Sequence, residues 1–145
     1  MSFREKSAWI SFVSISVVVG YYYTTLFMFL AENLNANPFE NPELVTHFFL
    51  SVAAITILEI VLHILIAIRS PQQLLAPKDE RERLISLQAF RIAYYVMALL
   101  SILAAFVIVH HPGGRWGLGN IVLLIVVLGE LTRSGGQIVY YRRGS

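Results

Sequence analysis

The stretch from Ser7 to Ala31 contains no charged residue. An α-helix rises about 1.5 Å per residue, so about 20 apolar residues cross a hydrocarbon core of roughly 30 Å. A secretory signal peptide has a shorter apolar core of about 7–15 residues, followed by a small-residue cleavage site. No Ala-x-Ala follows here, so the stretch predicts a retained transmembrane helix.

Three further apolar segments follow. With the first stretch they predict four spans, at about 7–31, 44–68, 89–110 and 117–141, and a linker at 69–88. The apolar part of the fourth, Leu118 to Gly129, is too short to span alone, so a re-entrant or interfacial helix is the alternative there. Only 14% of the residues are charged, against about 25% in a soluble domain. We therefore expect one all-α domain, an integral membrane four-helix bundle over residues 1–145.

Basic residues predict the orientation of these spans. They lie before span one, around the 69–88 linker and after span four: Arg4, Lys6, Arg69, Lys78, Arg81, Arg83, Arg91, Arg142 and Arg143. The other two loops contain Arg115 alone. By the positive-inside rule, we expect both termini and the linker on the cytoplasmic side of a plasma membrane.

The linker contains a helix start signal. Asp79 is followed three residues later by Glu82, a pair that resembles a capping box, so we expect a helix from about Glu80 through span three. The charged run at 79–83 is typical of a solvated helix start. The alternative is a docking surface for a soluble or membrane protein partner at the linker.

The two halves of the chain resemble each other weakly. Phe3–Arg4 precedes span one and Phe90–Arg91 precedes span three, while Glu59 and Glu130 lie in the second span of each half. This pattern is typical of two repeated antiparallel helix pairs related by an axis along the membrane normal. The alternative is that arginine simply marks cytoplasmic helix ends.

Small residues and tyrosines predict where the spans meet. Small residues at helical spacing indicate close contacts in spans one and three, at Ser16, Gly20, Thr24, Ala98, Ser101 and Ala105. The adjacent Gly135 and Gly136 indicate another near the end of span four. The hydroxyls of Tyr21–Tyr23 lie deep in span one, so at least one needs a polar partner. Ser51, at a similar depth in span two, is a candidate.

Five polar groups are expected in the cytoplasmic half of the bilayer. Glu59 and His63 are one helical turn apart, Glu130 and Arg133 are three residues apart, and Arg91 begins span three on the same side. A charged group in hydrocarbon costs about 2.5 kcal/mol or more, so these groups should face the interior as one cluster. Such a cluster either binds and releases protons or cations, or forms static interhelical pairs.

A second group of polar residues is expected at the other side of the membrane. His47 begins span two, His110 and His111 end span three, and Glu40 and Glu43 lie in the facing loop. Imidazoles and carboxylates at one depth could bind a transition metal, and His47 with His110 could be the axial ligands of a haem. Interfacial histidines without a ligand are the third interpretation.

The chain resembles a group of small uncharacterised bacterial inner-membrane proteins. The resemblance covers nearly the whole chain and depends on the four-span layout, Asp79-Glu80-Arg81-Glu82, Arg91, Tyr94-Tyr95 and the closing Tyr140-Tyr141-Arg142-Arg143. It implies a bacterial plasma membrane and brings no activity, cofactor or catalytic residue.

Several function classes are not expected. The chain has no cysteine, its one aspartate is Asp79, and it contains neither a phosphate-binding glycine loop nor an HExxH motif, so we do not expect an enzyme. No basic run with interleaved aromatics indicates nucleic-acid binding. Two hypotheses remain: an ion- or proton-handling transport protein, expected to be a homo-oligomer, or a non-catalytic sensor, accessory subunit or assembly protein.

Overall fold

The computed structural model describes residues 3–32, 42–69, 71, 79–110 and 115–143. Its four long helices are α1 (Phe3–Glu32), α2 (Pro42–Arg69), α4 (Glu80–His110) and α5 (Arg115–Arg143). All four are long and apolar enough to cross a membrane. The predicted all-α fold with four membrane-spanning helices is confirmed.

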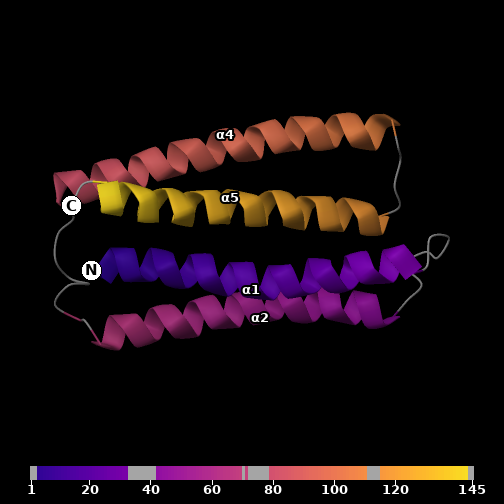
Figure 1. Ribbon diagram of the computed structural model, residues 1–145, viewed down its shortest axis with the longest axis horizontal. Helices are drawn as coiled ribbons and strands as arrows, with labels where there is room; N and C mark the ends of the chain where they lie inside the picture. Colours follow the sequence, from indigo (N-terminus) through magenta and orange to yellow (C-terminus); the bar gives the residue numbers. More distant parts are fainter. Residues whose placement is uncertain (1–2, 33–41, 70, 72–78, 111–114, 144–145) are drawn as a thin grey trace.

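The four helices lie side by side in a row (Figure 1). The order across the row is α4, α5, α1, α2, and the main helix contacts join α4 with α5, α5 with α1, and α1 with α2. The inner helices α1 and α5 therefore have neighbours on both sides, whereas α2 and α4 form the two edges. Polar side chains on the edge helices consequently do not converge on one central axis.

The helices run alternately in opposite directions, so α1 and α4 begin at the end of the row where α2 and α5 finish (Figure 1). We name this the basic end, because the described arginines and lysine near these helix termini gather there: Arg4, Lys6, Arg69, Arg81, Arg83, Arg142 and Arg143. The other end of the row is called the opposite end.

Helix α4 begins where the sequence predicts. The Asp79 carboxylate accepts a hydrogen bond from the Glu80 backbone N–H at 2.8 Å, and the Asp79 carbonyl accepts one from the Arg83 N–H at 3.0 Å. The first contact satisfies an amide group that a helix start leaves without a partner, and the second is the first backbone hydrogen bond of the helix. The Glu82 carboxylate, which a capping box would turn back toward Asp79, forms an ion pair with Arg4 of α1. Part of the expected linker is thus helical, and residues 72–78 lie outside the described residues.

The centre of the row is the contact between α1 and α5. Ile15 and Val19 of α1 pack with Val127 of α5 in a buried apolar cluster. Nearer the opposite end, the buried Tyr22 hydroxyl donates a hydrogen bond to Asn120 Oδ1 at 2.6 Å. The neighbouring Tyr23 hydroxyl donates to the Asn120 carbonyl at 2.8 Å. Tyr22 and Tyr23 therefore have a polar partner, as predicted. This partner is Asn120, so the prediction that Ser51 would be the partner was wrong.

Helix α5 is continuous, and its small residues allow close contacts. The alternative prediction of a re-entrant segment is wrong, because α5 runs unbroken between α1 and α4 (Figure 1). A methyl group added at Gly135 would lie 3.3 Å from the Phe12 ring of α1, and one at Gly136 would lie 3.5 Å from Ala89 Cβ of α4. The contacts predicted at these two glycines are confirmed. Gly20 is exposed with open space around its Cα, so the contact expected there is wrong.

Candidate functional site

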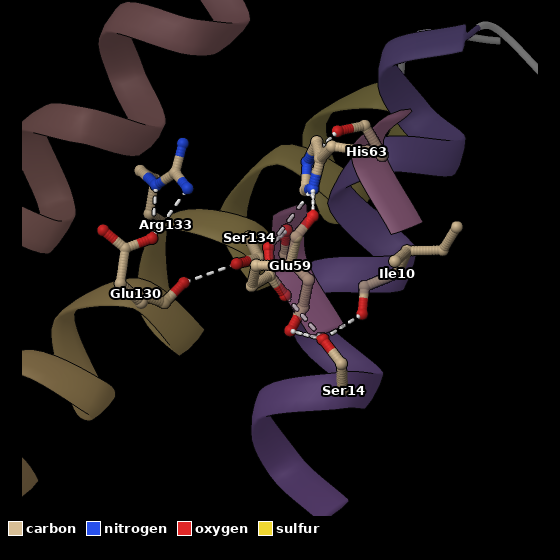
Figure 2. Close-up of polar contacts among 9 residues, drawn as sticks. Ile10, Ser14, Glu59, His63, Glu130, Arg133 and Ser134 are labelled. Carbon is tan, nitrogen blue, oxygen red and sulfur yellow. Dashed lines mark hydrogen bonds and ion pairs between the residues drawn. The ribbon is translucent and has the colours of Figure 1, made fainter. Parts of the chain in front are cut away.

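The strongest polar site lies between α1 and α2, around the Glu59 carboxyl group of α2 (Figure 2). The Ser11 hydroxyl donates a hydrogen bond to Glu59 Oε2 at 2.7 Å, and Ser14 Oγ lies 2.5 Å from Glu59 Oε1. Ser11 is buried, and the Glu59 side chain is 24% exposed. Each carboxyl oxygen of Glu59 therefore has a hydroxyl partner on the neighbouring helix.

His63 extends this site by one helical turn toward the basic end. Its Nδ1 lies 2.7 Å from the backbone carbonyl oxygen of Glu59 and 3.5 Å from Glu59 Oε2. A carbonyl oxygen can only accept, so Nδ1 carries a hydrogen. In neutral His63, Nε2 is then the acceptor for the Ser7 hydroxyl, at 2.8 Å. Protonation of Nε2 reverses that bond, with His63 donating to Ser7.

The three serines of α1 are absent from the predicted site, although a signal for them exists in the sequence. Ser7, Ser11 and Ser14 are spaced by four and three residues, which places them along one face of a helix. That face meets α2 at Glu59 and His63. Ser16 lies off this face, and its hydroxyl donates to the Phe12 carbonyl of its own helix at 2.6 Å.

The Ser14 hydroxyl is compatible with two charge states of Glu59. It lies 2.8 Å from the Ile10 carbonyl and 2.5 Å from Glu59 Oε1, yet it carries one hydrogen (Figure 2). If Glu59 is protonated, it can donate to Ser14 while Ser14 donates to Ile10. When Glu59 is a carboxylate, Ser14 turns its hydrogen to Oε1. The contact therefore serves both charge states without moving a helix.

The second acidic group forms a separate pair on α5. Arg133 Nε and Nη2 lie 2.8 Å and 2.7 Å from the same Glu130 oxygen, Oε2. The Arg133 guanidinium also lies over the Phe90 ring of α4, 5.3 Å from its centroid. The Glu130 side chain is 43% exposed, so it is more open than Glu59.

The five groups expected in one cluster thus lie in different places. Figure 2 shows Glu130 and Arg133 apart from Glu59 and His63, and Arg91 is exposed on α4. The physical reason is the row of helices. Helix α1 lies between α2, which carries Glu59 and His63, and α5, which carries Glu130 and Arg133, while Arg91 is on the far edge helix α4. The expectation of a single cluster was wrong, while the two pairs within it are present.

The histidines near the opposite end do not meet within the part of the chain that the structure describes. His47 lies on α2 with its ring 6.4 Å from the Tyr21 ring, and His110 of α4 stacks on Phe106 at 4.2 Å. Because α2 and α4 are the edges of the row, one chain does not bring His47 and His110 to a single haem iron. Among the described residues, no group of three or more potential metal-binding side chains is present. His111 and Glu40 lie outside the described residues.

Comparison with protein-family models, curated proteins and solved structures finds no match to this chain. No relative therefore supplies a function by homology. The Glu59 site is supported by its own geometry: a carboxyl group, two hydroxyls and an imidazole in one helix interface.

Proposed function

We propose that this membrane protein binds and releases protons at Glu59 and takes part in proton-coupled transport. The observation that carries the proposal is the Ser14 hydroxyl shared between the Ile10 carbonyl and the Glu59 carboxyl. An oxygen–oxygen separation of 2.5 Å is that of a strong O–H···O hydrogen bond, which both the neutral and the ionised form of Glu59 can make with a hydroxyl group.

His63 would exchange protons with Glu59. A proton arriving through Ser7 binds His63 Nε2, and the hydrogen on Nδ1 then passes to Glu59 Oε2 across the 3.5 Å gap. This transfer leaves a neutral imidazole with its hydrogen on Nε2 and a neutral glutamic acid. Reversal of the same steps returns the proton toward the basic end.

The location of the protein follows from its charge pattern and its resemblance to bacterial inner-membrane proteins. We propose a bacterial plasma membrane with the basic end in the cytoplasm, because arginine and lysine near helix ends favour that side. Both termini would then be cytoplasmic. The proton site would lie in the cytoplasmic half of the bilayer, reached from that side through Ser7 and His63.

The open row supports a homo-oligomer. Each half of the chain consists of a first helix (α1 or α4) and a second helix (α2 or α5). In the row α4, α5, α1, α2, first and second helices therefore alternate (Figure 1). The internal contact joins a second helix, α5, to a first helix, α1. The free edges are a first helix, α4, and a second helix, α2, so copies could repeat that contact and close into a ring. The mass of the protein in native nanodiscs tests this arrangement.

Proton flux in liposomes tests the function. Purified protein is reconstituted with a pH-sensitive dye inside, and an imposed pH gradient drives protons inward. Glu59→Gln should reduce the flux to the rate of empty liposomes. The fold should persist, because the Gln amide reproduces the bonds of the neutral acid by donating to Ser14 and accepting from Ser11.

Two variants are matched controls. Glu130→Gln removes the other intramembrane acid, and Ser16→Ala removes a hydroxyl from α1 outside the site. Both should keep most of the wild-type flux. If Glu59→Gln conducts like the wild type, or the wild type conducts like empty liposomes, the proposal is wrong. Glu59 would then be an interhelical contact of a non-catalytic sensor, accessory subunit or assembly protein.

A further inference from the structure

Helices α1 and α2 enclose an apolar groove on their outer surface. Two adjoining hollows, of about 400 and 460 Å³, share Trp9, Ile10 and Leu62 as a common wall. Both volumes lie within the range of small-molecule pockets. From the end of the groove at Lys6 to the other end at Val18 is about 18 Å at 1.5 Å per residue, close to the roughly 15 Å of one leaflet.

The polarity of the groove changes along its length. Lys6 and Arg69 line it at the basic end, and the part further into the membrane is lined by aliphatic residues together with Trp9 and Ser14. Within the described residues, neither Lys6 nor Arg69 forms an ion pair, unlike Arg4 with Glu82. Two cations that have no ion pair with any described residue therefore lie at one end of the apolar groove.

The indole that forms the shared wall is held in place. The Arg142 guanidinium lies over the Trp9 ring at 5.1 Å, and the Phe12 ring contacts the Trp9 ring edge-on at 6.4 Å. Contacts of this kind restrict the ring to one orientation. The groove is consequently preformed, which lowers the entropic cost of binding a chain-like ligand.

We propose that this groove is a binding site for an anionic phospholipid, with its phosphate at Lys6 and Arg69 and one acyl chain along Trp9, Ile10 and Leu62. An amphiphile with one negative end and a long apolar body matches both the charge and the length of the groove. A phospholipid supplies a phosphate at the level of the two cations and an acyl chain along the apolar wall, so an anionic lipid is the occupant that matches the whole groove.

Fluorescence quenching of Trp9 tests the site. Trp116→Phe leaves Trp9 as the single tryptophan of the full-length protein. The variant is reconstituted in equimolar phosphatidylglycerol and phosphatidylcholine, with bromine on the acyl chains of one lipid or the other, so the surface charge is identical in both samples. We define the preference as the quenching of Trp9 by brominated phosphatidylglycerol divided by its quenching by brominated phosphatidylcholine. It should be about fivefold or more, because each basic residue near the surface attracts anionic lipid.

Paired charge variants decide whether the preference belongs to the groove. Lys6→Gln with Arg69→Gln should bring the preference close to one, while Arg81→Gln with Arg83→Gln, at the same end on α4, should leave it intact. Unchanged helical circular dichroism verifies that each variant is folded. Equal quenching by the two lipids, loss of the preference in both double variants, or a Trp9 shielded from either brominated lipid by a second copy would each overturn the proposal.

Discussion

Glu59 and Glu130 occupy the second helix of each half of the chain, but their partners differ in kind. Glu59 is bonded by the hydroxyls of Ser11 and Ser14 and lies beside His63. Glu130 is held by the two nitrogens of Arg133 on its own helix. The first acid has partners that can donate or accept a hydrogen, and the second has a partner with a permanent positive charge.

The difference indicates what each site can do. A serine hydroxyl can turn its hydrogen toward a carboxylate or accept one from a carboxylic acid, so the Glu59 site serves both charge states. A guanidinium has donors only, so the Glu130 pair is complete when the acid is a carboxylate. Two acids at corresponding positions therefore need not share a role, and the partner side chains decide which one can exchange a proton.

The largest effect on stability should come from Arg133→Gln. Loss of the guanidinium leaves the Glu130 carboxylate without its ion-pair partner inside the membrane, which should lower the free energy of unfolding by about 2 kcal/mol. Unfolding titrations in mixed micelles measure this change. Adding Glu130→Gln to Arg133→Gln should recover most of the lost stability. If it does not, the contribution of Arg133 comes from its contact with the Phe90 ring and not from its ion pair with Glu130.

A smaller effect is expected from removing the hydroxyls at Glu59. Ser11→Ala combined with Ser14→Ala should lower the free energy of unfolding by about 1 kcal/mol, since interhelical hydrogen bonds in membranes average about 0.6 kcal/mol each. Proton flux should fall several-fold, because Glu59 loses its hydroxyl partners at both Oε1 and Oε2. Ser16→Ala is the control, because Ser16 lies outside the site. If it reduced the flux as much as the double variant does, Ser11 and Ser14 would have no special role in proton flux.

The smallest effect on stability is expected from His63→Gln, which should change the free energy of unfolding by less than about 0.5 kcal/mol. The amide can replace the bond from Nδ1 to the Glu59 carbonyl. Proton flux should fall several-fold, because a glutamine amide cannot pass a proton from Ser7 to Glu59. A flux profile identical to the wild type would exclude His63 from the proton path.

The long helices were predictable because their causes are local. Long runs with few charged residues predict each span, and Asp79 predicts the start of α4. The lateral order of the helices was not predictable in this way, since it depends on which faces fit best. Gly135 and Gly136 do make close contacts, whereas Gly20 is exposed, although all three look alike in sequence.

The site was predictable only within each helix. The pairs Glu59–His63 and Glu130–Arg133 follow from spacing on one helix. Whether the two pairs meet depends on the order of the helices in the row, which places α1 between α2 and α5. Ser7, Ser11 and Ser14 carry a visible helical spacing, but a row of serines can also bond its own backbone, as Ser16 does, so the spacing alone does not identify a partner helix.

The bonds from Tyr22 and Tyr23 to Asn120 have a consequence for the biosynthesis of the protein. They join residues 98 and 97 positions apart, whereas the Ser11–Glu59 bond joins residues 48 positions apart. A chain leaving the ribosome can therefore associate α1 with α2 well before Asn120 has been synthesised. Docking of α5 onto α1 becomes the closing step of assembly. Until then, the nascent protein carries a tyrosine-bearing polar face that lipid cannot satisfy.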